Sequence, residues 1–185
     1  MARRGSSDSN IRSGYPCICY HVSVNPYREL FQAMNDADIR YLVVGGVAVN
    51  LHGYSRFTGD LDIVMALDEK NLDHLAKLMD AKRFTQRLPI DVRLLSDRQQ
   101  VQKWITDKGL TAYTFVDQKM PQFSLDILAG ESWNFDNLDA HKVVIDAENL
   151  KIPVISIDDL IGMKKRANRQ KDIEDIAALL ELKGL

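Results

Sequence analysis

The segment 41–65 limits the possible folds of this chain more than any other part of its sequence. It begins with Tyr41-Leu-Val-Val44, a short apolar run that predicts a buried strand. Gly45-Gly46 follows directly, and the apolar residues Val47–Leu51 then predict a short helix. The sequence therefore predicts a buried strand that passes through two glycines directly into a helix.

The glycine pair predicts a phosphate-binding turn. Backbone N–H groups at a helix start lack intrahelical acceptors, and glycine lets a ligand approach the main chain closely. The turn is not a Walker loop, because no Gly-Lys-Ser/Thr follows, and it lacks the G-x-G-x-x-G spacing of dinucleotide-binding folds. A tight turn without a ligand is the alternative interpretation of Gly45-Gly46.

Two aspartates, Asp60 and Asp62, stand at the head of the next predicted strand, Leu61–Ala66. Side chains alternate along a strand, so both carboxylates point to one face while Leu61 and Ile63 point into the core. Like charges this close resist ionisation unless a cation lies between them. Oxygen ligands favour magnesium or manganese over zinc. The alternative is a solvated strand edge.

A third acid, Asp126, interrupts the apolar run Phe123–Leu128. A carboxylate in such a strand is costly to bury without a partner. If this strand lies beside the one with the first two aspartates, three carboxylates converge, enough to hold two divalent ions that promote an in-line displacement at phosphorus. The alternative is a turn, or a salt bridge from Asp126 to Arg93 or Lys119.

The remaining pattern predicts an α/β (α+β) fold, a mixed β-sheet flanked by helices with a C-terminal helical pair. Ser96, with Gln99 three residues later, predicts a capping box for a helix that ends near Gly109. The last helix has an apolar stripe of Ile173, Ile176, Ala177 and Leu180. The other predicted elements are helices 25–36 and 68–82, strands 113–116, 143–145 and 152–155, and a helix that begins at Ser156.

The chain of 185 residues is long enough for one domain, with 45% hydrophobic and 27% charged residues. We expect residues 1–22 to be a disordered or loosely attached tail and residues 23–185 to form the domain, including C-terminal helices over 156–183. The net charge of −2 argues against a wholly basic, nucleic-acid-covering surface.

No apolar run approaches the roughly 20 residues that span a bilayer, so no membrane partner is expected. The only cysteines, Cys17 and Cys19, are too close in sequence to pair easily, and a cytoplasmic location is the expectation.

The glycine pair, the Asp-x-Asp pair and the distant third acid together resemble the nucleotidyltransferase superfamily related to DNA polymerase beta. The chain is more similar to the small bacterial and archaeal branch that includes minimal nucleotidyltransferases and AbiEii-type abortive-infection toxins. Arg56-Phe-Thr58-Gly-Asp60-Leu-Asp62-Ile matches an Arg-x-Thr-x-Asp-hydrophobic-Asp signature of that branch. The segments Ser156–Lys164 and Arg169–Asp175 resemble its closing motif. The likeness covers roughly residues 39–182.

The resemblance implies that Gly45 and Gly46 hold the triphosphate of an NTP. Many members have Gly-Ser at this turn, so Gly46 takes the place of the serine and a hydroxyl contact is missing. Arg56 and Thr58 precede the acids in a loop that would overhang the site. There, Arg56 would pair either with a phosphate or with an aspartate that holds the loop.

The resemblance further implies that Asp60, Asp62 and Asp126 bind two Mg²⁺ ions, with Mn²⁺ as an alternative, and that Asp126 lies nearest the nucleophile. Lys164 would neutralise phosphate charge or engage the nucleotide, and Asp172 would position the nucleotide or its partner. The cations around Lys164 are explained either by a solvated helix face or by a contact with nucleotide or nucleic acid.

The activity implied is transfer of an NMP from an NTP to an acceptor hydroxyl, with release of pyrophosphate. The acceptor would be tRNA, protein or a small molecule, and a toxin-type enzyme would have a cognate antitoxin. The alternative is a non-catalytic nucleotide- or partner-binding protein that retains the fold.

Overall fold

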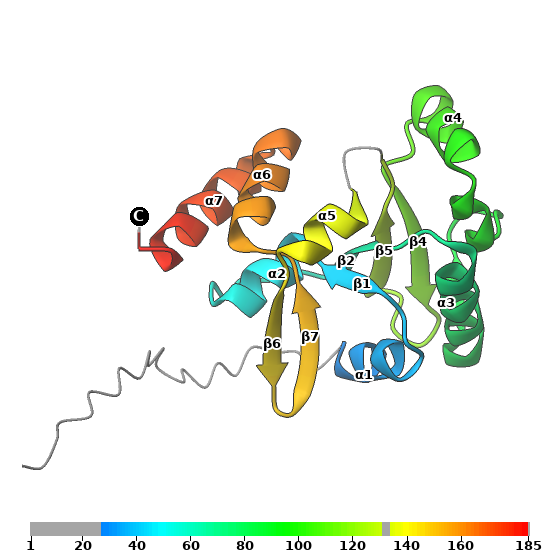
Figure 1. The fold of residues 1–185 in the computed structure, drawn as a ribbon, viewed down its shortest axis with the longest axis horizontal. Coiled ribbons are helices and arrows are strands. Elements are labelled where there is room, and N and C mark those ends of the chain that lie inside the picture. Colours follow the sequence, from blue (N-terminus) through cyan, green and yellow to red (C-terminus); the bar gives the residue numbers. More distant parts are fainter. Residues whose placement is uncertain (1–26, 131–133, 185) are drawn as a thin grey trace, which may run out of the picture.

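A seven-stranded mixed sheet forms the centre of the computed structural model, which describes residues 27–130 and 134–184 (Figure 1). The predicted N-terminal tail, both cysteines and the predicted helix start at Asn25-Pro26 lie outside the described residues. The strands are β1 (Tyr41–Val43), β2 (Asp60–Met65), β3 (Phe84–Gln86), β4 (Ala112–Asp117), β5 (Ser124–Leu128), β6 (Val143–Ala147) and β7 (Leu150–Val154). Their order is β3-β4-β5-β2-β1-β7-β6.

The sheet is mixed because β2 runs parallel to β5 and antiparallel to β1, while β1 runs parallel to β7. The two outer strand pairs, β3–β4 and β6–β7, are antiparallel. The pairing of β2 with β5 joins segments that are far apart in the sequence. This pairing is the one that positions the candidate site.

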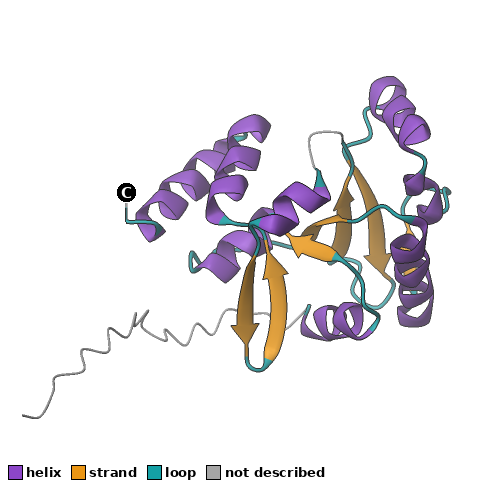
Figure 2. Ribbon diagram, in the orientation of Figure 1, coloured by secondary structure: helices purple, strands orange, loops and turns teal. Residues whose placement is uncertain are grey.

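Helices flank the sheet, and Figure 2 shows the helices in purple and the strands in orange. The C-terminal pair lies on one side of the molecule and contacts α2, whereas α3 and α4 lie on the other side (Figure 1). The helices are α1 (Arg28–Asp36), α2 (Gly45–His52), α3 (Glu69–Lys82), α4 (Arg98–Lys108), α5 (Phe135–Ala140), α6 (Ile157–Ala167) and α7 (Gln170–Leu182), with a 3-10 helix at Val92–Ser96. The predicted mixed sheet with a C-terminal helical pair is confirmed.

Alternation along the central strands separates the core from the site. Leu61 and Ile63 of β2 are completely buried, as is Leu125 of β5. The aspartates between these residues point to the opposite face of the sheet. A period-two pattern therefore places apolar side chains in the core and carboxylates on the other face of the same two strands.

The predicted capping box at Ser96 is wrong. Ser96 ends the 3-10 helix, and its hydroxyl donates to the Arg93 carbonyl. Asp97 caps α4 instead, because its carboxylate accepts from the Gln100 backbone N–H. The chain also forms β3 and α5, which the sequence pattern did not predict.

The predicted apolar stripe of the last helix is confirmed only in part. Ile176 and Leu180 are partly buried and pack against the core, whereas Ile173 is 57% exposed. The most deeply buried residues of α7 are Asp172, Asp175 and Leu179, each at most 1% exposed. Two carboxylates take core positions because cationic side chains meet them there, as described below.

None of the helices in the described ranges is long and apolar enough to cross a membrane.

Candidate active site

The turn between β1 and α2 brings two glycines against the acidic strand. Gly45 adopts a φ of +62°, and a Cβ at this position would lie 2.6 Å from Cγ of Asp62. A Cβ on Gly46 would lie 2.6 Å from the Thr58 hydroxyl and 2.9 Å from Nη2 of Arg56. Only residues without a side chain fit this close approach to Asp62, Thr58 and Arg56. The helix begins at Gly45, two residues earlier than the predicted start at Val47.

The first turn of α2 has no side-chain cap. Its N-cap residue is Val44, which provides no side-chain hydrogen bond. The backbone N–H groups of a first turn have no intrahelical acceptors, so an anion is a natural partner for them. The Val44 N–H donates to the Asp62 carbonyl at 2.9 Å, and this bond ties the helix start to β2.

The three predicted acids lie on the paired strands β2 and β5. Asp62 is directly opposite Asp126 in the parallel register, and Asp60 is opposite Ser124. The Ser124 hydroxyl donates to Asp60 Oδ1 at 2.8 Å. Within the described parts of the chain, no cation forms an ion pair with Asp126, and Arg93, the partner considered from the sequence, pairs with Asp73 instead.

The paired carboxylates resist ionisation in this arrangement. Burial, together with the nearby charges of Asp126 and Asp60, raises the pKa of Asp62 to about 6 against the opposing charges of Arg169 and Lys171. Burial likewise raises the pKa of Asp126, opposed by a hydrogen bond from Thr114. A bound cation would therefore stabilise the ionised form of these two partly buried acids on adjacent strands.

The residues present fit a hard divalent cation. The donors are all carboxylate oxygens, and Oδ1 of Asp126 is buried without a hydrogen-bond partner. Among the residues that the structure describes, no group of three or more His, Cys, Asp or Glu side chains is already gathered into a metal-binding cluster. The fit therefore rests on the facing pair Asp62 and Asp126, with Asp60 two residues along the same face of β2.

The C-terminal helical pair adds a buried network of charges. Asn168 adopts a φ of +49° and ends α6, and α7 then packs back against α6. Nζ of Lys164 lies 2.6 Å from Oδ2 of Asp175 and 3.4 Å from Oδ1 of Asp172. Nε of Arg169 donates to Asp172 at 2.8 Å. Lys164 and Asp172, each predicted as a site residue, are thus brought together from two helices.

Arg56 connects this network to the glycine turn. Its Nη2 donates to Oδ2 of Asp175 at 2.9 Å, and its Nε lies 2.7 Å from Oδ1 of the same carboxylate as a charge contact without hydrogen-bond geometry. Of the two partners considered for Arg56, the structure shows an aspartate that holds the loop. Arg56 and Thr58 together cover Gly46.

A cleft of about 610 Å³ joins the acids to the helical pair. Its lining includes Gly45 and Asp62 and, from the helical pair, Lys164 and Arg169. Apolar side chains from α4 and the loop after it, the end of β5, and α6 complete the lining, with Ile105, Leu110, Leu128, Leu160 and Met163. The cleft thus combines charged residues with an apolar lining.

Three residues of this site were missed as site residues by reasoning from the sequence: Ser124, Arg169 and Asp175. Ser124 gives no local signal, since its contact with Asp60 depends on the β2–β5 register. The signal for Asp175 is its spacing, because Asp172, Asp175 and Leu179 share one helix face with the i, i+3, i+7 period.

Comparison with family models identifies the class of protein that this fold and site define. Residues 29–185 match the family described as nucleotidyl transferase AbiEii toxin, type IV TA system. The chain therefore belongs to the AbiEii family of nucleotidyltransferases and is a nucleotidyltransferase. The search of curated proteins gives no match.

Solved structures agree with this assignment at the level of the fold. A putative nucleotidyltransferase from Thermotoga maritima, TM1012, shares 13% identity with a TM-score of 0.54, over 85% of this chain and 92% of that one. An antigenic nucleotidyltransferase-like protein from Paracoccidioides brasiliensis shares 20% identity with a TM-score of 0.56, over 85% and 74%. The lincosamide antibiotic adenylyltransferase LnuA, in a lincomycin-bound structure, shares 14% identity with a TM-score of 0.57, over 83% and 94%.

Proposed function

We propose that this nucleotidyltransferase moves an NMP from an NTP to an acceptor hydroxyl, releases pyrophosphate and depends on a divalent metal ion. The observation that carries the proposal is the position of Asp62, which faces Asp126 and lies against Gly45 at the uncapped start of α2. The two acids would bind a cation and the first turn of α2 would bind an anion, so both would act on the same triphosphate and its metal ion.

The glycine turn would bind the triphosphate. The first-turn N–H groups of α2 would donate to its phosphate oxygens. The Thr58 hydroxyl lies close to the space that a side chain on residue 46 would occupy. Thr58 is therefore suited to supply the hydroxyl that the missing serine supplies in other members of the superfamily.

The acids would organise the reacting groups. The acceptor oxygen forms a bond to the α-phosphorus, the bond from that phosphorus to the bridging oxygen breaks, and pyrophosphate leaves. The carboxylate of Asp126, whose pKa is raised by burial, would accept the proton of the acceptor hydroxyl. Asp60, held by Ser124, and Asp62 would orient the triphosphate together with the bound ion. Mg²⁺ or Mn²⁺ held by the three acids would supply neutralisation of the charge on the phosphates.

The family description extends the proposal to the biological partners. Membership of a family described as a toxin of a type IV toxin–antitoxin system supports a cognate antitoxin as partner. We propose tRNA or protein as the acceptor of a toxin-type enzyme, with a small molecule as the alternative. A lincosamide acceptor belongs to LnuA by that protein's own name, and similarity of fold alone does not carry it to this chain.

The test is transfer of label from each of four α-labelled NTPs into the fractions of a cell extract, with Mg²⁺. Wild type should label one macromolecular fraction, and Asp62→Asn should not. Asp158→Asn, an exposed acid of α6 paired with Lys183, is the matched control and should retain transfer. Tight NTP binding without transfer into any fraction would overturn the transfer reaction and leave a nucleotide-binding protein.

A further inference from the structure

The network beneath the cleft contains more cations than carboxylates. Three basic side chains, Lys164, Arg56 and Arg169, share two buried acids, Asp172 and Asp175. Both acids are about 1% exposed, so the three basic side chains, rather than solvent, balance their negative charges. The network therefore carries one surplus positive charge beside the candidate active site.

The surplus charge is located by comparing the exposure of the three cations. Lys164 is 3% exposed and contacts both carboxylates, so its charge is neutralised within the protein. Arg56 has a side chain that is 20% exposed; its Nε and Nη2 face Asp175, and its Nη1 donates to the Phe57 carbonyl. The side chain of Arg169 is 58% exposed and has a single carboxylate partner. The cation available to a ligand is therefore Arg169.

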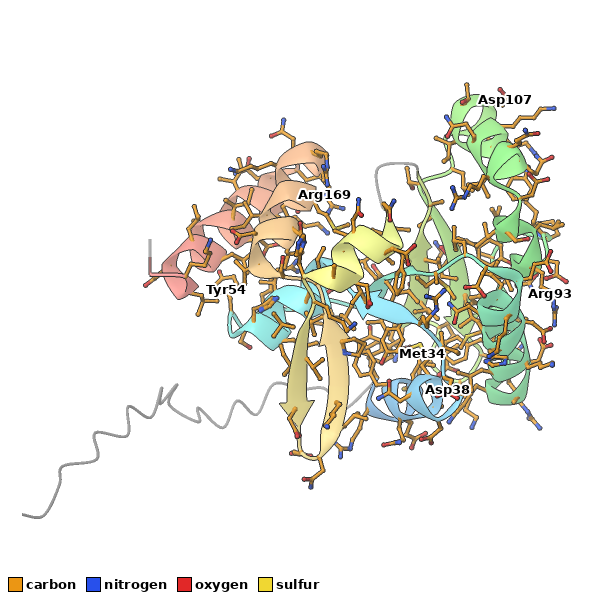
Figure 3. All side chains as sticks on the ribbon, in the orientation of Figure 1. Met34, Asp38, Tyr54, Arg93, Asp107 and Arg169 are labelled. Carbon is orange, nitrogen blue, oxygen red and sulfur yellow. The ribbon has the colours of Figure 1, made fainter. Side chains whose placement is uncertain are left out.

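Arg169 is held in a fixed orientation that leaves part of its guanidinium unused. Nε and Nη2 donate to the two oxygens of Asp172 at 2.8 and 3.3 Å, whereas Nη1 donates to no residue in the described ranges. A guanidinium fork bound along one edge is preorganised for an anion at its other edge. Figure 3 shows Arg169 at the edge of the helical pair nearer the sheet.

Its position in the cleft points to the anion. Arg169 lines the same cleft as Asp62 and Gly45. The group bound at the Gly45 turn and the acids would be a triphosphate. A cation that lines the same cleft as that turn would meet the part of the triphosphate that becomes pyrophosphate.

We infer that Arg169 binds the β- and γ-phosphates of the NTP, and that Lys164 and Asp172 act as positioning residues that hold Arg169 toward the cleft. This inference rests on the proposed function, because it assigns a residue to the leaving group of that reaction. Departing pyrophosphate gains negative charge on the bridging oxygen, and a guanidinium bound to it stabilises that charge.

The experiment is calorimetric titration of the full chain, in Mg²⁺ buffer, with the four NTPs and with the NMP of whichever nucleotide binds. Arg169→Gln should weaken NTP binding about tenfold, the loss of one charge-assisted contact, and should leave NMP binding unchanged. Arg169→Lys should recover part of the loss, since the charge returns without the fork.

Arg93→Gln is the matched control. Arg93 is also an exposed arginine bound to an aspartate, Asp73, and Figure 3 shows it on the side of the molecule opposite Arg169. This variant should bind both ligands as wild type does.

The outcomes separate the two proposals. Equal NTP affinity in Arg169→Gln and wild type would overturn the role of Arg169 while leaving the proposed function intact. Equal losses of NTP and NMP affinity would also overturn it, because they would indicate a general distortion of the cleft. Absence of NTP binding by wild type would overturn the proposed function itself, and the inference with it.

Discussion

Gly45 and Asp62 are packed so closely that any side chain on residue 45 would overlap the Asp62 carboxylate. The contact joins the first turn of α2 to the acidic face of β2, and the left-handed conformation of Gly45 makes it possible. An acid beside the positive end of a helix is stabilised there, so this contact also contributes to the electrostatics of the site. The glycine is required for the position of the acid as well as for the turn.

Gly45→Ala should therefore strongly reduce transfer, because the new side chain displaces Asp62. We expect strain of about 1–2 kcal/mol from the positive φ, and a displaced Asp62 with a loss of transfer of about 100-fold or more. Gly109→Ala is the matched control, because Gly109 has a φ of +64° and open space around its missing Cβ. It should show similar destabilisation in urea with full transfer. Equal activity losses in both variants would contradict the assignment of Gly45.

The stability of the wild-type protein should fall as pH rises from about 4 to about 7 in the absence of divalent ions. The pKa of Asp62 is raised from 3.8 to about 6 in the folded state, so the folded chain binds more protons than the unfolded chain in this window. The stability it contributes at low pH is lost as pH passes through the folded pKa. The loss from this residue should be on the order of 2 kcal/mol.

Asp62→Asn should remove most of this pH dependence and be more stable than wild type at pH 8. The amide avoids both the cost of burying a charge and the repulsion from Asp126. Urea unfolding at pH 5 and pH 8, with EDTA, measures the effect. Asp158→Asn should retain the wild-type slope, and a wild-type slope in Asp62→Asn would refute the assignment.

Mg²⁺ should stabilise the wild-type protein, because an ion that binds only the folded state shifts the unfolding equilibrium by mass action. At ten times the dissociation constant the expected gain is about 1.4 kcal/mol, which is a rise of a few degrees in Tm for a domain of this size. The rise should be larger at pH 8 than at pH 5, should be reversed by EDTA, and should be absent in Asp62→Asn. A wild-type Tm unaffected by Mg²⁺ and Mn²⁺ would argue against a metal site at these acids.

Asp175→Asn should strongly destabilise the fold. Removing this charge leaves Lys164 and Arg56 without their shared partner, and breaking a buried ion pair on one side typically costs about 3–5 kcal/mol. Denaturant unfolding measures the loss. Asp158→Asn, in the exposed pair with Lys183, should change stability far less. Similar stabilities for the two variants would show that the charge network does not hold the helical pair in place.

The parts of the fold that local patterns control agree with the sequence. Alternation around Asp60 and Asp62 predicted an acidic strand, and Asp68 and Ser156 cap the helices expected after them. The prediction at Ser96 was wrong because Ser96 and Asp97 are both good N-cap residues, and their hydrogen bonds distinguish them. Periodicity located only part of the buried face of α7, since Ile176 packs against the core but Ile173 is exposed and Asp175 is buried.

The sequence by itself determined the acidic strand, the glycine turn and the family to which they point, because neighbouring residues and their alternation carry those features. It also supplied Asp126, but not its position. Only the tertiary structure placed Asp126 opposite Asp62, because that contact depends on the parallel register of two strands separated by a long stretch of chain. It likewise decided that Lys164 is neutralised and Arg169 exposed, since charge balance in a buried network depends on which side chains meet there.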